Sequence, residues 1–325
     1  MSLQTKSDGP PTQNFVEECK VCWRQMPQKG FFFALFISWL CLFHFLGNST
    51  LGYVETRSLF GWLKYAYSNS PDDEHGFLIP LVVLVLSWWK RKELLAVPKA
   101  NWWPALGLVM VALLLHIVGY VVQQTRISVV AFFVGLYGLT GLIWGRRWLL
   151  ASFFPYLLFA FCFPLATVSD KITFPLRLLA THITAGISAT VLGIDVIQNG
   201  TQIFDAQRTF QYEIAAACSG LRSLTATLAI AIIYGFMTFR GSLRRLVIIA
   251  SAVPLAVAGN VFRLMIIIVV AEAFGQEAGN FVHNNFWLSL LPYVPALGGI
   301  ALIGYLLREG KEGPKPGQQL VHQLT

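Results

Sequence analysis

The sequence has little charge for its length. Asp, Glu, Lys and Arg make up only 12% of its 325 residues, whereas hydrophobic residues make up 55% and the mean hydropathy is +0.60. Soluble globular domains carry roughly 25% charged residues, because a folded chain needs them at its surface in water. This composition excludes a water-soluble protein and predicts that the chain is embedded in lipid.

Cysteine is also scarce, and its placement argues against a disulfide framework. The five cysteines are Cys19, Cys22, Cys41, Cys162 and Cys218. Their number is odd, and three lie in or against apolar segments, where a thiol behaves as a small hydrophobic group. Cys19 and Cys22 have the C-x-x-C spacing of a zinc or redox site, but no second pair and no nearby His completes a four-ligand shell. We therefore expect free cytosolic thiols there, with no metal and no cofactor.

The net charge of +8 does not form a nucleic-acid-binding surface, because Lys and Arg stand in small groups beside apolar blocks rather than in a continuous stripe. Such groups indicate membrane topology instead. The first thirty residues are polar, and no small-residue cleavage site follows the first apolar block, so we expect that block to serve as an uncleaved signal.

Nine apolar blocks are separated by short polar connections. At 1.5 Å per residue, each can approach the roughly 30 Å of bilayer hydrocarbon. This pattern predicts an all-α polytopic transmembrane helix bundle with a cytoplasmic segment over 1–30, one membrane-embedded domain over 31–307 and a cytoplasmic tail over 308–325. The blocks are 31–47, 76–89, 102–122, 127–144, 148–166, 174–194, 215–239, 246–271 and 286–307.

Basic groups assign the sides of the membrane. They precede the first block and follow the second, fourth and seventh, and these ends belong in the cytoplasm. If residues 174–194 spanned the bilayer fully, the basic group after the seventh block would lie outside instead of in the cytoplasm. Because the block 174–194 contains Arg177, His182 and several Thr and Ser residues, we expect it to lie at the outer interface or to re-enter. About eight spans then remain, with both termini inside.

Two connections are then expected to face the outside, namely residues 195–213 and 272–285. The first alternates apolar and polar residues around turn-forming residues, which predicts a short extended excursion such as a hairpin. It leads directly into Cys218, in the segment AAACSGLRSL at the start of the seventh block.

Cys218 is a candidate nucleophile. Unpaired amides and the dipole at a helix N-terminus lower a thiol pKa, which converts an inert thiol into a reactive thiolate. The ordinary alternative is a small buried side chain. Its neighbours Ser219, Gly220 and Arg222 favour a functional site.

Arg263 and His283 are the other two candidates. Arg263 lies within the eighth block, in GNVFRLM, where an unpaired guanidinium costs several kcal/mol, and Asn260 shares its helix face. A structural Arg paired with a backbone carbonyl or with Glu272 is the alternative. His283, in FVHNNFW, is expected in the following outer loop. A nucleophile, a cation for an oxyanion and a proton donor would then lie on one side of the membrane.

These segments together resemble the exosortase family, membrane-embedded bacterial transpeptidases related in role to sortases but not in fold. The resemblance runs from Trp62 to about Phe286. It rests on HGFLIP from His75, GIDVIQNG, EIAAACSGLRSL from Glu213, GNVFR and His283. Members of the family often carry a Gly shortly after the His, where this chain reads HNNFWLSLL.

The resemblance implies which residues act. The essential Cys, Arg and His of the family correspond to Cys218, Arg263 and His283, which makes 31–307 the catalytic domain. Supporting residues are expected beside them or in the shared motifs, with the role of His75 open: Glu213, Ser219, Arg222, Asn260 and His75.

The resemblance also implies a function. The substrate would be an exported protein with a C-terminal sorting signal of the PEP-CTERM kind, consisting of a short motif, one transmembrane helix and a basic cluster. The enzyme would act at the outer face of the bacterial inner membrane, in envelope or exopolysaccharide sorting. A Cys218 thioester would form and pass to an unidentified envelope acceptor or to water.

Two other classes of protein remain possible from the sequence. A transporter or flippase for an envelope glycan or lipid-linked substrate also carries Arg and His within a bundle, but it predicts inverted repeats with broken helices, which the sequence does not display. A non-catalytic scaffold in polysaccharide export would tolerate loss of the Cys218 thiol.

The topology can be tested with reporter fusions. A reporter active only outside the cytoplasm is expected to give signal when fused after Ala271, and none when fused after Arg245 or at Thr325. A reporter active only inside should give the opposite pattern. A cytoplasmic signal from residues 272–285 would contradict the proposed position of the site.

Overall fold

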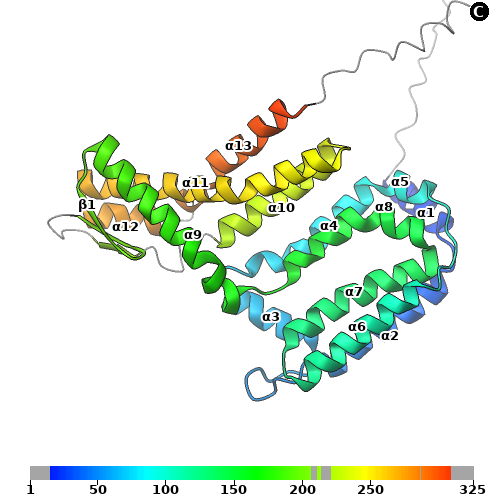
Figure 1. Ribbon diagram of the computed structural model, residues 1–325. Coiled ribbons are helices and arrows are strands. Elements are labelled where there is room, and N and C mark those ends of the chain that lie inside the picture. The colour runs from blue at the N-terminus through cyan, green and yellow to red at the C-terminus, as the bar shows by residue number, and fades with distance from the viewer. Residues whose placement is uncertain (1–14, 206–210, 214–220, 286, 309–325) are drawn as a thin grey trace, which may run out of the picture. The chain divides into compact units, whose positions relative to one another are not determined.

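The computed structural model describes residues 15–205, 211–213, 221–285 and 287–308, which are predominantly helical (Figure 1). The chain divides into two compact units, Met1–Pro164 and Leu165–Thr325. The predicted fold class, an all-α polytopic helix bundle, is confirmed. The division into segments 1–30, 31–307 and 308–325 stays a prediction.

In the first unit, α7 is the central helix and packs against α2, α3, α6 and α8. The elements of this unit are α1 Phe15–Gln25, α2 Lys29–Leu46, α3 Leu59–Asn69, the 3₁₀ turn η1 Glu74–Phe77, α4 Ile79–Trp89, α5 Arg91–Ala96, α6 Ala105–Val121, α7 Thr125–Trp144, α8 Arg146–Leu157 and the 3₁₀ turn η2 Leu158–Cys162. The predicted block 148–166 therefore divides into α8, which contains Pro155, and η2.

Polar groups inside the first unit are paired with one another. The buried Asn48 accepts a hydrogen bond from the Thr125 hydroxyl at 2.5 Å and donates one to the Thr56 carbonyl at 2.6 Å. His116 lies 3.0 Å from the Ser128 hydroxyl, so it is a satisfied core histidine. Such pairing is required where no water reaches the polar group.

In the second unit, the 33-residue helix α11 packs against α9, α10, α12 and α13. The elements of this unit are α9 Ala166–Ile187, the π-helical turn η3 Ser188–Leu192, β1 Val196–Asn199, β2 Gln202–Asp205, β3 Gln211–Glu213, α10 Leu221–Thr238, α11 Ser242–Phe274, α12 Gln276–Asn284, the 3₁₀ turn η5 Leu288–Leu290 and α13 Tyr293–Leu306.

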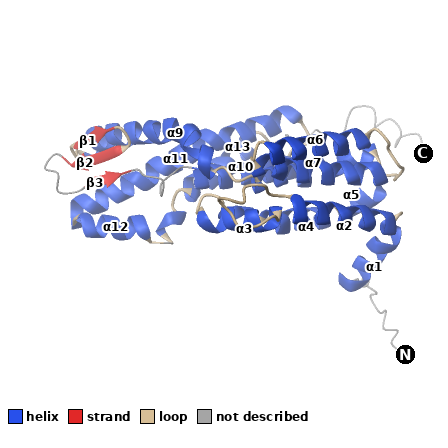
Figure 2. Cartoon of the chain, turned by 90° about the horizontal axis from the view of Figure 1, so that it is seen from below, coloured by secondary structure: helices blue, strands red, loops and turns tan. Residues whose placement is uncertain are grey.

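The predicted extended excursion is confirmed as a three-stranded antiparallel sheet in the order β1-β2-β3. Ile203 of β2 pairs with Gln198 of β1 and with Tyr212 of β3, and its side chain is buried in the core of the unit. Figure 2 shows the strands beside α9, which β1 and β2 contact.

Helix α9 buries its polar face. Its buried positions recur every three or four residues and pack towards α11, whereas Phe174, Leu179 and Val191, the last in the adjoining turn η3, are at least 47% exposed. The hydroxyls of Thr181 and Thr184 donate to carbonyls one turn earlier in the same helix. The buried side chains are Thr173, Arg177, Ala180, Thr181 and Thr184, continued by Ser188 in η3.

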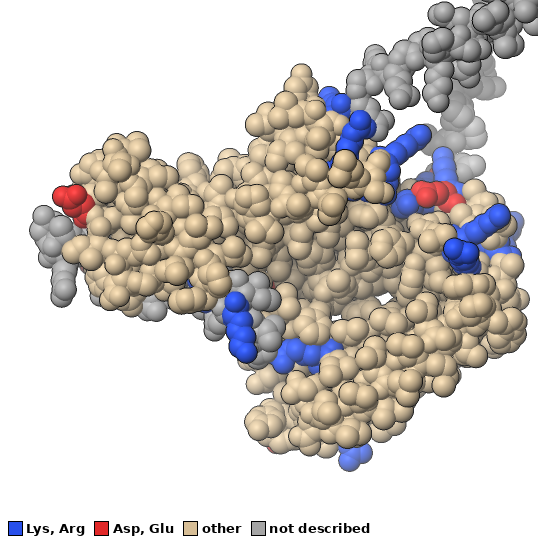
Figure 3. Space-filling model, in the orientation of Figure 1, with Lys and Arg blue, Asp and Glu red and all other residues tan. Residues whose placement is uncertain are grey.

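Within the described residues, four helices are long and apolar enough to cross a membrane, namely α2, α7, α10 and α11. Three shorter apolar helices, α4, α6 and α13, add to them, whereas α9 does not meet this criterion. Most of the surface in Figure 3 carries neither acidic nor basic side chains. The number of eight spans stays a prediction, because length and composition alone support these assignments.

The loop conformation expected for residues 272–285 is wrong for most of their length, since residues 276–284 form α12, whereas their position outside the membrane stays a prediction. This segment was missed because it is short and polar and therefore gives no apolar block. Its ends are nevertheless typical of a helix, with the acidic Glu277 in the first turn and the basic residue His283 in the last, the placement that the helix dipole favours.

Gly259 allows α13 to begin directly against α11. A Cβ at this position would lie 2.2 Å from the carbonyl oxygen of Pro292, closer than any real contact. The first residue of the GNVFR motif therefore fixes the start of α13 one helical turn before Arg263.

Gly259→Ala is expected to lower the free energy of unfolding by about 1–3 kcal/mol, the usual cost of overpacking. Gly298→Ala is the matched control, since it lies in α13 and nothing is found within 4 Å of the place that its new Cβ would take, so it should be neutral or slightly stabilising. Thermal unfolding in detergent compares the two. Equal midpoints would contradict the close contact.

Candidate functional site

Arg263 is buried in the middle of α11, with 8% of its surface exposed. Its Nη2 donates to the main-chain carbonyl of His283 at 2.9 Å. Among the described residues, no acceptor lies within hydrogen-bonding distance of its Nε. A bond to a backbone carbonyl is what we expect of an arginine with a purely structural role. A buried guanidinium with an unfilled donor can also bind a further anionic oxygen.

His283 lies in the last turn of α12, so it is brought to Arg263 through its backbone. Its Nδ1 lies 3.0 Å from the side-chain oxygen of Asn284. The chain turns into α12 at Gly275, where φ is +87°. Residues other than glycine rarely adopt this backbone conformation. Glu272, the other partner considered for Arg263, is exposed and forms no ion pair with it.

Asn260 connects α11 to the first turn of α10. Its Oδ1 accepts a long hydrogen bond, 3.4 Å, from the hydroxyl of Ser223. Arg222 precedes Ser223, so the polar part of AAACSGLRSL that is described lies next to the polar part of GNVFR. The structure thus brings together Arg222, Asn260, Arg263 and the backbone of His283 within one unit.

The remaining predicted residues are not assembled in this way. Cys218 and Ser219 lie outside the described residues, and so does the side chain of Glu213. His75 is in η1 of the first unit, where it is half-buried. The predicted roles of these four residues stay predictions.

Tyr293 is a residue that the sequence did not single out. It is the first residue of α13, directly after Pro292, and the charges of both Arg222 and Arg263 act on its hydroxyl. The signal in the sequence was indirect, because Gly259 allows the close approach of α13 but does not say which segment approaches.

Arg177 is the second buried arginine of the described chain, on the face of α9 that packs towards α11. In the sequence, Arg177 served only as a reason to expect that residues 174–194 do not span the bilayer fully. A charged side chain buried between two helices is expensive and is usually functional in membrane proteins.

No group of three or more His, Cys, Asp or Glu in the described part of the chain could hold a metal ion. Cys19 and Cys22 are half-buried free thiols on α1. The arrangement around Arg263 instead offers hydrogen-bond donors in a buried setting, which can stabilise negative charge on oxygen.

Comparison with known proteins agrees with the motifs. The family model for transmembrane exosortases matches residues 62–291, which include Cys218, Arg263 and His283. No curated protein and no solved structure matches the chain. Because the match covers more than half of the sequence, this multi-pass membrane chain belongs to the transmembrane exosortase family.

Proposed function

We propose that the protein is a cysteine transpeptidase that cleaves the C-terminal sorting signal of exported proteins. The observation that carries this proposal is the buried Arg263, which bonds to the backbone of His283 and keeps a donor free of described partners. Both residues lie in the matched family region together with Cys218. The site is proposed to face the outside of the bacterial inner membrane, on the strength of the basic groups at the other helix ends.

In the proposed reaction, the Cys218 thiolate attacks the carbonyl carbon of the scissile peptide bond. A C–S bond forms, and the carbonyl electron pair moves onto oxygen. The Arg263 guanidinium donates hydrogen bonds to this oxyanion, which is worth most in a buried site from which water is excluded.

The tetrahedral intermediate then collapses, the C–N bond breaks, and His283 gives its proton to the leaving amine. The product is a thioester on Cys218. An amine or hydroxyl of an envelope acceptor, or water, then attacks the thioester carbonyl and gives its proton to His283, and the C–S bond breaks to release the Cys218 thiolate.

Connectivity supports placing Cys218 near this site. Arg222 follows it by four positions, and a chain spans at most about 3.6 Å per residue, so the two Cα atoms are within about 14 Å. Ser223, the next residue, bonds to Asn260 one turn from Arg263.

Cys218→Ala is expected to abolish processing of a co-expressed substrate while the amount of enzyme in the membrane stays unchanged, because the substitution removes only the nucleophile. Cys41→Ala is the matched control, since Cys41 is an exposed thiol on α2, and it should process normally. Immunoblotting of precursor and product gives the readout. Normal processing by Cys218→Ala would reject the cysteine-dependent enzyme and leave the transporter and the non-catalytic scaffold.

Arg263→Lys keeps the charge but loses the planar set of donors, so acylation should fall by about 10²–10³, the effect of removing one oxyanion donor. The readout is the amount of hydroxylamine-sensitive adduct on Cys218 at early times. Arg240→Lys, at an exposed position after α10, is the control and should acylate normally. If Arg263→Lys acylates at the wild-type rate, another group such as Arg222 must stabilise the oxyanion.

A further inference from the structure

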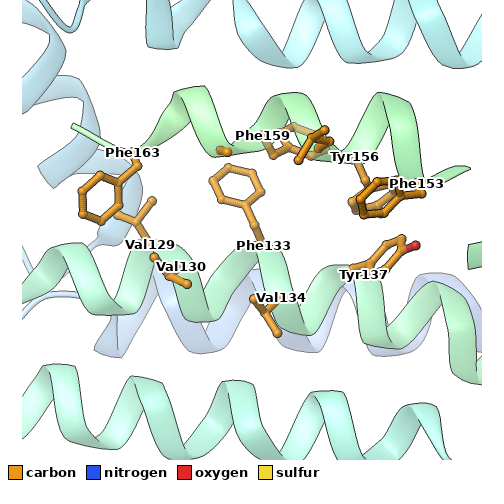
Figure 4. A pocket seen from close by; sticks show the side chains of 11 residues that line it. Val129, Val130, Phe133, Val134, Tyr137, Phe153, Tyr156, Phe159 and Phe163 are labelled. Carbon is orange, nitrogen blue, oxygen red and sulfur yellow. The ribbon is translucent and has the colours of Figure 1, made fainter. Parts of the chain in front are cut away.

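The first unit contains two apolar pockets that the proposed reaction does not use. The first, about 420 Å³, lies between α7 and the α8–η2 segment (Figure 4). The second, about 310 Å³, is lined by residues of α2, α3, η1, α4, α7 and η2. Both volumes are in or near the range of about 300–1,000 Å³ typical of small-molecule sites.

The two pockets are neighbours across one pair of rings. Phe133 of α7 and Phe159 of η2 line both pockets, and their rings stack with centroids 4.6 Å apart. Figure 4 shows Phe133 reaching from α7 towards the segment that carries Phe159. The two pockets therefore adjoin at this pair of rings.

The local sequence explains why a gap exists between helices that touch elsewhere. Pro155 lacks an N–H for the α-helical ladder, and the chain tightens into the 3₁₀ turn η2 three residues later. Aromatic side chains from both sides, such as Tyr137 and Tyr156, hold the segments apart with centroids 4.8 Å from each other.

The tyrosine hydroxyls in these walls already have protein partners. Tyr137 donates to the Leu149 carbonyl and Tyr67 to the Cys162 carbonyl, each at 2.5 Å, and Tyr156 is hydrogen-bonded to Thr140. A ligand in the two pockets therefore meets hydrocarbon and ring faces along most of its length. This surface suits a flexible alkyl chain and offers nothing to orient a polar molecule.

Lys64 is the charged residue of the second pocket. It lies on α3, its side chain is exposed, and no described carboxylate forms an ion pair with it. A lysine in this position lines the pocket with its alkyl stem and holds its ammonium at the rim. An apolar pocket with one cation at its mouth matches an anionic headgroup attached to a hydrocarbon chain.

We propose that the first unit binds an anionic phospholipid, with its phosphate at Lys64 and one acyl chain in the second pocket, extending past Phe133 and Phe159 into the first. Phospholipid is the occupant because the rim is exposed on the apolar surface, with Val130 at 40% and Phe153 at 47%. A peptide helix is about 10–12 Å across, too wide for a gap between α7 and α8, which contact each other.

The test uses the full chain in lipid nanodiscs that contain phosphatidylglycerol with a photoactivatable group midway along its acyl chain. After irradiation, labelled peptides are identified by mass spectrometry. We expect saturable labelling of peptides that line the two pockets, competed by unlabelled phosphatidylglycerol more strongly than by phosphatidylcholine.

Two substitutions and their controls separate the headgroup from the chain. Lys64→Gln should weaken binding about fivefold, the effect of one lysine near an anionic lipid surface. Arg57→Gln, an exposed cation outside both pockets, should not change it. Leu136→Trp should fill the second pocket and abolish labelling there, whereas Met110→Trp, on the exposed face of α6, should leave it intact.

Labelling spread over all exposed apolar helices without saturation would mean bulk lipid only and would overturn the proposal. Equal competition by phosphatidylcholine, or wild-type binding in Lys64→Gln, would remove the headgroup site. Displacement of the lipid by an apolar transmembrane peptide that itself labels the pockets would assign them to a helix instead. Lys64→Gln keeps the test valid even if Leu136→Trp fails to fold, because Lys64 is exposed and is not part of the buried core.

Discussion

The structure depends on one constraint, namely that polar groups in a lipid-embedded chain must find their partners within the protein. Helix α9 illustrates it in part. It exposes Phe174 and Leu179 and buries a row of hydroxyls, of which those of Thr181 and Thr184 bond to carbonyls of their own helix, whereas those of Thr173 and of Ser188 in η3 have no partner among the described residues. A soluble helix would have the opposite arrangement. The first unit obeys the same rule, since Asn48 and His116 are buried and each is paired with a hydroxyl of α7.

Arg263 is one of several buried groups with a side-chain atom that has no hydrogen-bond partner among the described residues. It is buried in the longest helix, it bonds to one backbone carbonyl, and its Nε has no acceptor among the described residues. Elsewhere such a donor would be a net cost of folding. At a site where negative charge develops on oxygen, the same unfilled donor becomes useful, because its orientation is set before the reaction begins. The polar contacts of Asn260 and the close packing at Gly259 hold this segment in place.

The two units use their interiors differently. In the second unit, charged and polar groups gather around α11, whereas the pockets of the first unit are lined almost entirely by aromatic and aliphatic groups. The proposed division of labour follows from these linings: reaction chemistry in the second unit and lipid binding in the first. HGFLIP contributes to both the fold and the second pocket, since Gly76, Phe77 and Pro80 line it.

The sequence by itself determined that the chain lies in lipid, its fold class, its family and the extended segment that forms β1–β3. Composition, block length, motifs and alternation are local properties that can be read along the chain. Tertiary structure decided what hydropathy averages cannot express. It decided that 276–284 is a helix, that α9 buries its polar side, that Pro292 lies on Gly259, and that Arg263 meets the backbone of His283. The physical reason is that hydropathy measures how much apolar surface a segment has. Packing between distant segments decides which face of the segment is buried and which neighbour it contacts.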